Sequence, residues 1–408
     1  MQDRLLDDWI DTYLEYTEIS EPSRMYRLWS AIAVIAGCLQ RKCRLNWGSL
    51  TFYPNMYIVF VGPPAARKGT AMDQGFFFLD KLNIKVAAEA ITREMLIRDL
   101  KNSNDNDMDI KTGKMIFHSS LTIWSQELTV FLGYNNMQLL SDLTDWYDCR
   151  NKWVYRTKHE GVDDIVGVFV NLCGATTPEL IRSMMPLNAI GGGLTSRMIF
   201  IFEFDKGKVV PYTHSPEELE NKLLSDLEKI RMMSGRFSGT DAFMELWVDW
   251  YIEANKNPPF KDSRFDGYMQ RRGNHIMKLS MILNASRTGD MIITDKDLQR
   301  AIDVLNMTEK KMLNTFSGVG KAPLSDVMAK VMVDISMSGE DWVLFSELLD
   351  KYKDDADDWG MEKIMKTLEK SKWVKRKDMP GDTAYKYVPK TERKKENERG
   401  EEPILPKT

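Results

Sequence analysis

The sequence is poor in metal-ligating side chains and lacks the long apolar runs that cross membranes. It contains 4 cysteines and 4 histidines among 408 residues, and no two cysteines form a CxxC pair. A zinc centre is therefore not expected, and unpaired thiols fit a reducing cytoplasm. The longest apolar run near the start, Ala31–Leu39, is far too short for a membrane-spanning helix. We therefore expect a cytoplasmic protein, in the host cytoplasm if the source is a virus, with no membrane partner.

The sequence also lacks a strong net charge. Its formal net charge is −4, so any surface for nucleic acid must be local rather than spread over the whole molecule. With 43% hydrophobic and 28% charged residues, the composition is that of a globular protein. A chain of 408 residues exceeds one ordinary domain, so two or three domains are expected.

The order of predicted elements divides the chain into five parts. Residues 1–50 are predicted to be helical, and residues 51–213 alternate apolar strands with helices, the pattern of an α/β core with a mostly parallel sheet. Residues 214–318 are predicted to form an all-helical lid, and residues 324–389 a compact final unit. The charged tail, residues 390–408, is expected to be disordered. The predicted strands are Met56–Val61, Lys85–Ala87, Leu121–Trp124, Val166–Leu172 and Arg197–Phe202.

The most informative segment is Met56–Met72. An apolar strand enters a Gly/Pro turn and a lysine opens a helix, which is the layout of the phosphate loop G-x-x-x-x-G-K-[ST]. Gly62 and Lys68 have the expected spacing, whereas Arg67 replaces the second glycine and Gly69 replaces the hydroxyl residue. Backbone N–H groups at the helix start can still face phosphate oxygens, and the lysine can still reach the β- and γ-phosphates.

This loop is the predicted ATP site, with an ordinary strand–turn–helix junction as the alternative. The residues predicted to hold ATP are Gly62, Pro63, Pro64, Ala65, Ala66, Arg67, Lys68, Gly69 and Thr70. Thr70 is also a candidate ligand of Mg²⁺, displaced by one position from the usual hydroxyl. The Lys-Gly-Thr spelling is similar to the loop of adenylate kinases, which leaves a small-molecule kinase as a further alternative.

Another predicted strand, Leu121–Trp124, is soon followed by Gln126 and Glu127. ATPases place acids at such a strand end to hold Mg²⁺ and to polarise the attacking water. Glu127 is the only acid there, so it is the candidate catalytic base and a candidate metal ligand. The alternative is that Glu127 simply begins a surface helix, where an acid is favoured. Farther along, Asp142, Asp145 and Asp148 are expected on a solvated helix face.

Two polar residues lie near the later strands. Asn171 is expected at the end of an apolar strand, where it could orient the lytic water, or else cap the turn that follows. Arg197 follows a run of three glycines and begins the last strand, so it could reach across a subunit boundary to a neighbour's γ-phosphate. The alternative for Arg197 is a surface salt bridge of little energetic value.

The order of these pieces resembles that of the AAA+ ATPases over roughly residues 50–317. Within that class the chain looks like the replicative helicase-type ATPases of phages, plasmids and mobile elements, the helicase module of the primase–helicase family. The likeness is carried by Tyr53–Gly62, Arg67–Thr70, Gly174–Pro178, Gly193–Phe200 and Arg271–Ser280. The resemblance implies a P-loop NTPase core of three layers, bound ATP and Mg²⁺, and a homo-oligomeric ring of six subunits. It also implies that Arg271 or Arg272 is the sensor-two arginine that contacts the nucleotide; the alternative is an arginine on the helix surface.

The final unit, residues 324–389, is expected to contain three helices and a β-hairpin, which resembles a winged helix. The second helix is expected to begin at Val343. Basic residues gather on the third helix and the hairpin, where they could neutralise DNA phosphates: Lys363, Lys366, Lys370, Lys372, Lys375, Arg376 and Lys377. Because Lys351–Asp358 holds four aspartates, a winged helix that binds protein is the alternative.

The function expected from the resemblance is that of an ATP-dependent DNA helicase or translocase acting in phage or mobile-element replication. Single-stranded or forked DNA would be gripped by pore segments, for which Asn102–Lys114 and Lys152–His159 are the candidates, the latter through Lys152, Arg156 and Lys158. Any primase or polymerase would be a separate polypeptide. The alternative is an ATP-binding replication initiator or scaffold with little or no hydrolysis.

Overall fold

A computed structural model describes residues 4–133, 136–157, 161–184, 192–213, 216–316, 324–339 and 341–389. The chain divides into two compact units, Met1–Ser317 and Gly318–Thr408. The expected N-terminal segment, core and lid thus belong to one unit. The predicted linker at residues 317–323 and the predicted disordered tail lie outside the described residues. No helix in the described ranges is both long enough and apolar enough to cross a membrane.

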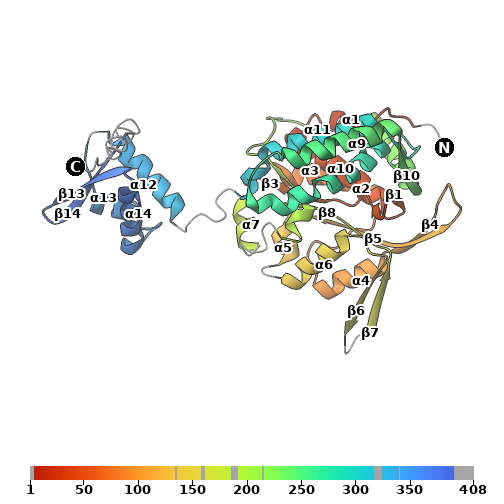
Figure 1. The fold of residues 1–408 in the computed structure, drawn as a ribbon, viewed down its shortest axis with the longest axis horizontal. Helices are drawn as coiled ribbons and strands as arrows, with labels where there is room; N and C mark the ends of the chain where they lie inside the picture. Colours follow the sequence, from red (N-terminus) through yellow and green to blue (C-terminus); the bar gives the residue numbers. More distant parts are fainter. Residues whose placement is uncertain are drawn as a thin grey trace, which may run out of the picture. The chain divides into compact units, whose positions relative to one another are not determined.

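The first unit is built around a five-stranded sheet with the order β4-β5-β8-β3-β9 (Figure 1). Its strands are β3 Tyr57–Val61, β4 Asn104–Met108, β5 Met115–Ser125, β8 Val168–Thr176 and β9 Met198–Phe202. Neighbouring strands are parallel except β4, which pairs with β5 in the antiparallel direction at one edge. The expected α/β class is confirmed. The predicted strand Lys85–Ala87 is reduced to an isolated bridge between Val86 and Thr122.

Helices cover both faces of this sheet, and β3 and β9 are apolar throughout. All five residues of β3 and of β9 are buried, as expected for parallel strands covered on two sides. On one face, the Asn171 side chain of β8 contacts α2 (Arg24–Leu39). On the other face, Gly174 of β8 lies against Leu128 of α5 (Leu128–Leu132). Because nearly every residue of α2 is buried, the N-terminal segment is part of the core.

A second, smaller sheet has the order β11-β10-β1-β2. Its strands are β1 Cys43–Trp47, β2 Leu50–Phe52, β10 Gly235–Gly239 and β11 Ile292–Ile293. The prediction that residues 214–318 are all helical is therefore wrong. The reason is that β10 and β11 are short, and β10 pairs with β11 on one side and with the distant β1 on the other. Pairings between distant segments leave no periodic signal in the sequence.

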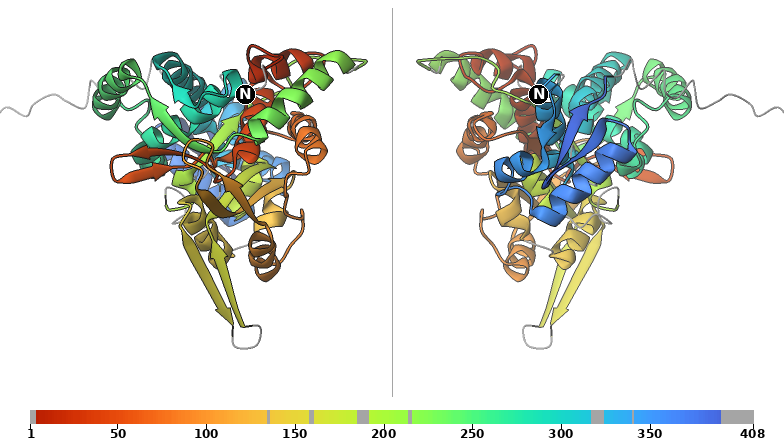
Figure 2. Two further views of the ribbon diagram at one scale, coloured as in Figure 1. Left: turned by 90° about the vertical axis from the view of Figure 1, so that its right-hand side faces the viewer. Right: turned by 90° about the vertical axis from the view of Figure 1, so that its left-hand side faces the viewer.

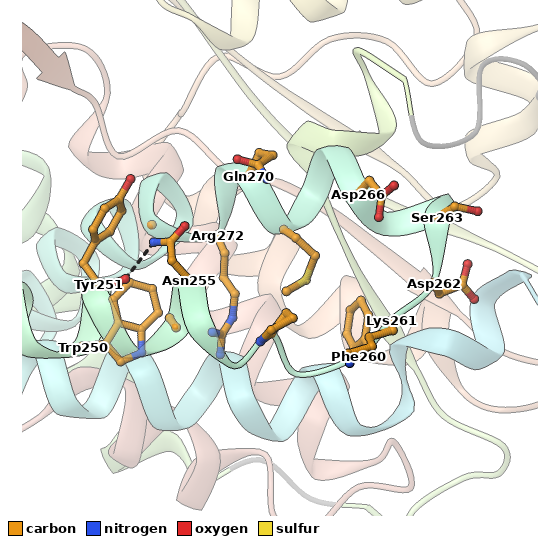
Figure 3. Close-up of a pocket in the computed structure, with 14 residues that line it drawn as sticks. Trp250, Tyr251, Asn255, Phe260, Lys261, Asp262, Ser263, Asp266, Gln270 and Arg272 are labelled. Atoms are coloured by element: carbon orange, nitrogen blue, oxygen red, sulfur yellow. Dashed lines mark hydrogen bonds between the residues drawn. The ribbon is translucent and has the colours of Figure 1, made fainter.

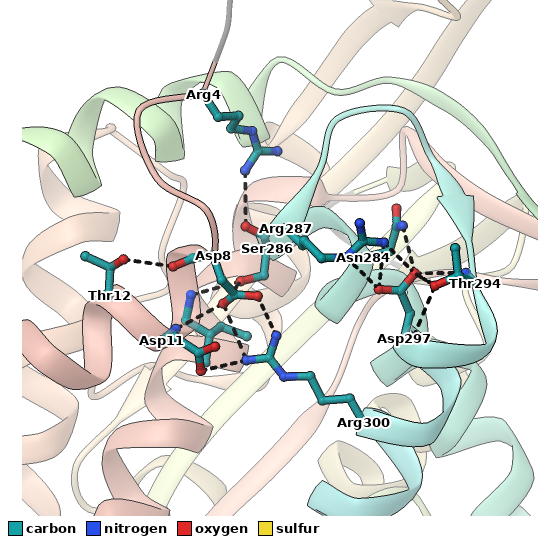
Figure 4. Close-up of polar contacts among 11 residues, drawn as sticks. Arg4, Asp8, Asp11, Thr12, Asn284, Ser286, Arg287, Thr294, Asp297 and Arg300 are labelled. Atoms are coloured by element: carbon teal, nitrogen blue, oxygen red, sulfur yellow. Dashed lines mark hydrogen bonds and ion pairs between the residues drawn. The ribbon is translucent and has the colours of Figure 1, made fainter.

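The helices of this region otherwise follow the apolar periodicity. They are α8 Glu217–Arg231, α9 Asp241–Lys256, α10 Asp266–Arg287 and α11 Asp295–Met312. The N-terminus is tied to α10 and α11 by a polar network (Figure 4). Ser286 Oγ donates to Asp8 at 2.8 Å, and Arg300 forms an ion pair with the same carboxylate. At the start of α11, Thr294 and Asp297 form a capping box, which fixes where the helix begins.

A β-hairpin projects from the first unit (Figure 2). It consists of β6 Lys152–Thr157 and β7 Gly161–Val166, paired in the antiparallel direction. The hairpin is inserted between α6 (Met137–Tyr147) and β8. The other short elements of the unit are α1 Trp9–Tyr16, α3 Lys68–Lys81, α4 Arg93–Asn102, α7 Pro178–Met184, η2 Thr195–Arg197, η3 Ser263–Phe265 and η4 Leu313–Phe316.

The second unit contains three helices and a three-stranded antiparallel sheet of order β12-β14-β13. Its elements are α12 Ser325–Met337, β12 Val343–Leu344, α13 Phe345–Lys351, α14 Asp358–Lys370, β13 Val374–Met379 and β14 Asp382–Tyr387. Helix α14 buries Met361, Ile364 and Leu368 in the core of this unit. The expected helix start at Val343 is wrong, because Val343 and Leu344 pair with β14 and the helix begins at Phe345.

Candidate functional site

The parallel strands of the central sheet bring several predicted site residues to one edge. Val61, at the end of β3, lies opposite Thr176 of β8 and Phe202 of β9. Ser125, at the end of β5, lies opposite Gly174. The segments that follow these strands, including the Gly62–Arg67 loop, therefore leave the sheet at its carboxyl edge, where open α/β sheets place their ligands.

The Gly62–Arg67 loop leaves the sheet through a tight passage that needs glycine. A Cβ atom on Gly62 would lie 2.5 Å from the Tyr26 hydroxyl and 2.6 Å from the Glu203 carbonyl oxygen. Farther along, Ala65 and Arg67 have φ angles of 66° and 62°. Arg67, where the phosphate-loop signature has glycine, is therefore in the left-handed region that glycine favours.

Lys68 points back into the Gly62–Arg67 loop. Its Nζ donates to the carbonyl oxygens of Gly62 at 2.7 Å and Pro63 at 2.9 Å. Burial lowers the pKa of Lys68, while the nearby carboxylates of Glu127 and Glu179 act in the opposite direction. The ammonium thus sits at the mouth of the loop with neutral carbonyl partners. An anionic oxygen would be a stronger acceptor for it.

The helix face beside Lys68 differs from the prediction for Thr70. Gly69 faces β5, and a Cβ atom there would lie 2.9 Å from Gln126 Oε1. Thr70 is exposed on the adjacent face of α3, about 100° around the helix from Gly69. One turn after Gly69, Asp73 accepts a hydrogen bond from Gln126 Nε2 at 2.5 Å. The sequence does not single out Asp73, although its spacing of four from Gly69 puts both on one helix face.

The described residues near Lys68 offer oxygen ligands for a magnesium ion, but they do not surround a metal site. Thr70, Asp73, Gln126 and Glu127 offer hydroxyl, amide and carboxylate oxygens near the loop. Among the residues that the structure describes, no three His, Cys, Asp or Glu side chains gather to hold a metal. These residues therefore fit a cation that keeps most of its ligands from phosphates and water, as Mg²⁺ does.

Glu127 lies between β5 and α5 with its side chain exposed. It precedes the first residue of α5, but its carboxylate makes no capping hydrogen bond. Glu127 thus stands at the start of a helix, as the alternative expected, but its carboxylate does not cap that helix. Glu127 follows the end of β5 at the carboxyl edge of the sheet, the edge at which the Gly62–Arg67 loop also begins, and an exposed carboxylate there can accept a proton from water.

The predicted position of Asn171 at a strand end is wrong. Strand β8 continues to Thr176, so Asn171 lies five residues, about 16 Å, before that end. Its side chain is fully buried; Oδ1 accepts from Met56 N at 3.0 Å and Nδ2 donates to the Ala33 oxygen at 3.1 Å. The strand continues because residues 172–176 pair with β3 along its whole length, a pairing that the sequence does not reveal. Asn171 neither orients water at this edge nor caps a turn.

Thr176 takes the place at the strand end that was expected for Asn171. It is buried at the last position of β8, opposite Val61. Its hydroxyl donates at 3.4 Å to the carbonyl oxygen of Thr177. The sequence indicates a turn here, because Thr176 and Thr177 stand directly before Pro178, the first residue of α7. The predicted strand ended at Leu172, so it left Thr176 in a loop.

Arg197 lies at the opposite edge of the sheet. Met198, the next residue, pairs with Tyr57 at the beginning of β3. Arg197 Nη2 contacts Asp148 Oδ2 at 2.6 Å, and Nη1 donates to the Gly193 oxygen at 2.8 Å. The Arg197 side chain is only 8% exposed. This agrees with a salt bridge but not with the expected surface position, and it places the guanidinium away from the Gly62–Arg67 loop of its own chain.

The prediction that Arg271 or Arg272 contacts the nucleotide is not supported by their positions. Arg271 Nε donates to Ser196 Oγ at 3.2 Å, beside Arg197 at the amino edge of the sheet. Arg272 is buried against α11, where Nε donates to Glu309 at 2.7 Å and Nη2 to Asn306 at 2.6 Å. The predicted lid arginines thus bind other parts of the protein, because α10 crosses the amino end of β9 rather than its carboxyl end.

Of the three aspartates expected on a solvated face, only Asp142 differs from the prediction. It is buried and accepts from Arg93 Nε at 2.6 Å. The side chains of Asp145 and Asp148 are 39% and 43% exposed, and they pair with Arg150 and Arg197.

The candidate DNA-binding residues fall into two groups. On the hairpin, Arg156 is exposed and Lys152 forms a surface ion pair with Asp164 at 2.8 Å, whereas Lys158 lies outside the described residues. Residues 102–114, the other candidate pore segment, include the edge strand β4. In the second unit the predicted basic side chains are all exposed; they are Lys363, Lys366, Lys370, Lys372, Lys375, Arg376 and Lys377. Lys366 and Arg376 form surface ion pairs with Glu362 and Asp378.

A separate cavity of about 550 Å³ lies between α9 and the start of α10 (Figure 3). Trp250, Tyr251 and Phe260 supply aromatic walls, and Lys261 and Asp262 supply charges. Neither the Gly62–Arg67 loop nor Glu127 lines this cavity.

No protein-family model matches this chain, and no curated protein matches it in sequence. The function must therefore be inferred from the arrangement of the residues themselves.

Proposed function

We propose that this protein binds and hydrolyses ATP with Mg²⁺ and uses the energy to move along DNA as a helicase or translocase. The observation that carries the proposal is the position of Lys68. Its ammonium is held by the carbonyl oxygens of Gly62 and Pro63, at the sheet edge where Glu127 also lies. A lysine, a glycine-dependent turn and a helix start at the carboxyl end of a buried parallel strand are the parts of a phosphate site.

In this proposal, phosphate binding and activation of the attacking water are assigned to different residues of the chain. Lys68 and the N–H groups at the start of α3 would hold the β- and γ-phosphates. Glu127 would accept a proton from the attacking water, and the Thr176 hydroxyl at the end of β8 would help to orient that water. Bound Mg²⁺ supplies positive charge that neutralises the phosphate oxygens. Asp73 and Gln126 would meet the hydration shell of that cation from the α3 and β5 sides.

The strand order supports the resemblance to AAA+ ATPases. The loop-bearing strand β3 lies between β8 and β9, and β5, which precedes Glu127, lies beyond β8. The second unit, with its three helices and antiparallel sheet, is proposed to be a winged helix. Its exposed basic residues on α14 and β13, together with the β6–β7 hairpin, would contact DNA phosphates. A ring of subunits, with six as the family expectation, would place the hairpins around one strand.

The competing proposal is an ATP-binding initiator or scaffold that hydrolyses slowly or not at all. It is favoured by the strand end after β5, where Gln126 stands and binds Asp73 instead of leaving a free aspartate for the metal. In that case ATP binding would serve assembly on DNA, and Glu127 would have no catalytic part.

The deciding measurement is DNA-stimulated ATPase activity of the wild type, Lys68→Ala and Glu127→Gln. A motor requires activity in the wild type and its loss in both variants, with Glu127→Gln still binding ATP. Wild-type ATP binding with no turnover above that of Glu127→Gln would favour the scaffold. If the wild type does not bind ATP in the presence of Mg²⁺ and DNA, both proposals fail.

A further inference from the structure

Helix α9 (Asp241–Lys256) is covered along one side only in the part of the chain that the structure describes. Of its 16 residues Phe243 alone is buried, and the rest of the side that faces the unit is half-buried. Trp247 packs on α10 so closely that a Cβ atom on Gly273 would lie 3.1 Å from the indole ring. This contact fixes which side of α9 faces inward.

A row of apolar side chains, next to the inward side of α9, is exposed. Met244, Val248 and Ile252 follow one another at intervals of four residues, and each is between 41% and 51% exposed. Tyr251, with half of its surface exposed, joins this row to the ring of Trp247. Residues four apart form a ridge along a helix, and such a ridge packs into the groove of a second helix. The apolar ridge Met244, Val248 and Ile252 therefore has the form of one side of a helix–helix contact.

A row of carboxylates runs beside the apolar ridge on its outer side. Its four members are also four residues apart and all are exposed: Asp241, Glu245, Asp249 and Glu253. About 100° of rotation separates Met244 from Glu245, so the two rows are neighbours on the helix surface. Within the described residues, none of these four carboxylates forms an ion pair. This acidic row repels the phosphates of DNA and of anionic lipids, and it attracts lysine and arginine side chains.

The C-terminal part of α9 borders the cavity of about 550 Å³ (Figure 3). Trp250 and Tyr251 of α9 form its walls together with Phe260. Arg272, which also lines the cavity, is already bound within the protein through Nε and Nη2, and its guanidinium carbon lies 5.3 Å from the centre of the Trp250 ring. The cavity thus offers aromatic surface to a large side chain from outside, next to the apolar ridge.

We propose that the apolar ridge, the acidic row and this cavity together form a docking surface for a basic amphipathic helix of a partner protein. The apolar face of that helix covers the ridge, and its lysine and arginine side chains face the acidic row. One large side chain at its end enters the cavity as an anchor. The inference goes beyond the proposed function and does not depend on it, because no residue of α9 is assigned to ATP or to DNA.

Binding of designed peptides to the full-length protein tests this surface. The probe is a fluorescent lysine–leucine peptide of about 16 residues, with its leucines at the spacing of an amphipathic helix. One control peptide has the same composition with the leucines at scrambled positions, and a second keeps the pattern with glutamate in place of lysine. In anisotropy titrations the patterned lysine peptide should bind, and both controls should bind at least about tenfold more weakly. Equal affinity for the patterned and the scrambled lysine peptides, or no binding of either, would overturn the proposal.

Variants of the apolar ridge locate the binding. Met244→Ser combined with Val248→Ser should weaken binding of the patterned lysine peptide by at least about tenfold. Val333→Ser, at a valine 49% exposed on α12, is the matched control and should leave the affinity unchanged. Because all three side chains are exposed, the variants should keep the fold, which the urea midpoint of each checks.

Variants of the acidic row test the charge of the partner. Glu245→Gln combined with Asp249→Asn should lower the affinity for the lysine peptide and reduce its dependence on salt. Asp80→Asn combined with Glu89→Gln removes the same charge at two exposed positions elsewhere and should change neither quantity. A salt dependence equal in the two double variants would show that the acidic row does not face the peptide.

Three further measurements on the Met244→Ser and Val248→Ser double variant exclude other occupants. A lower oligomeric mass than that of the wild type, without peptide, would show that a second copy of the chain covers the ridge. Weaker binding to single-stranded DNA, or to vesicles of phosphatidylglycerol, would assign the ridge to nucleic acid or to a membrane. Any of these results would overturn the proposal. The ATPase activity of this variant should equal that of the wild type, so failure of this inference is distinguishable from failure of the proposed function.

Discussion

The Nε atom of Arg67 lies 2.6 Å from the Glu21 carboxylate, on a residue whose backbone is in the left-handed region at φ 62°. Lys206 binds the same carboxylate, and hydrogen bonds from Lys206 and Arg67 lower the pKa of Glu21 to about 2. The ion pair therefore holds in place an arginine at a position where glycine would be free of strain. Arg67 therefore replaces the glycine of the phosphate-loop signature, keeps the left-handed backbone that glycine favours, and forms an ion pair with Glu21.

Replacing Arg67 should separate backbone strain from the ion pair. Arg67→Ala loses the Glu21 contact and keeps a Cβ in the left-handed region, whereas Arg67→Gly loses the same contact and relieves the strain. We expect Arg67→Gly to be more stable than Arg67→Ala by about 1 kcal/mol in urea unfolding. Both should still bind ATP, since Lys68 and the N–H groups of α3 remain. An alanine variant as stable as the glycine variant would contradict the backbone explanation.

Asn171 and Thr176 should show opposite phenotypes, although both lie on β8. Asn171→Leu leaves the buried Met56 N–H and the Ala33 carbonyl without their side-chain partner, and should cost about 2–4 kcal/mol of unfolding free energy. Thr176→Val keeps the branched shape and removes a weak hydrogen bond at the carboxyl edge. It should lower the ATPase rate by at least about tenfold with little change in stability. Urea unfolding and steady-state turnover of the two variants test this; a stable but slow Asn171→Leu would return Asn171 to the catalytic site.

Lys278 should make stability depend on alkaline pH. Its pKa in the folded protein is about 8, below the ordinary value of 10.5, because burial penalises the charged form. Between these values the unfolded chain binds more protons than the folded one, so stability should rise with pH over that window. The penalty is complete below pH 8 and is relieved as pH rises toward 10.5. The stability of the wild type relative to Lys278→Met should therefore increase between pH 7.5 and 9.5, by at most about 1.4 kcal/mol per pH unit. A difference that stays constant with pH would show that Lys278 keeps its proton in the folded protein as in the unfolded chain, so that burial does not lower its pKa.

The sequence predicts structure that is formed by contiguous residues better than structure that depends on contacts between distant segments. The strand, turn and helix around Gly62 and Lys68 are contiguous, so their pattern predicts their geometry. The end of β8 depends on its pairing with β3 up to Thr176, and strand β10 depends on pairing with β1. Neither pairing between distant segments leaves a periodic pattern in the sequence. The position of Arg271 depends on which end of β9 helix α10 crosses. The sequence thus predicts the candidate site on its own strand and not the residues that reach it from elsewhere.

The two basic surfaces can be assigned by the salt dependence of DNA binding. Each phosphate neutralised by a lysine or arginine contributes about 0.7 to 0.9 to the slope of log affinity against log salt. The hairpin is tested by Lys152→Ala combined with Arg156→Ala, and the second unit by Lys366→Ala combined with Lys370→Ala, all of which are exposed side chains. If both surfaces contact DNA, each double variant should lower the slope by between about 1 and 2 for single-stranded DNA.

The ATPase activity of the same two variants tests whether the hairpin acts in translocation. If the hairpin contacts DNA during translocation, the hairpin variant should lose DNA stimulation of ATPase activity and the second-unit variant should keep it. An unchanged slope in the second-unit variant would show that its basic face does not bind DNA and would favour a protein partner there. An unchanged slope and unchanged stimulation in the hairpin variant would remove the hairpin from the translocation mechanism.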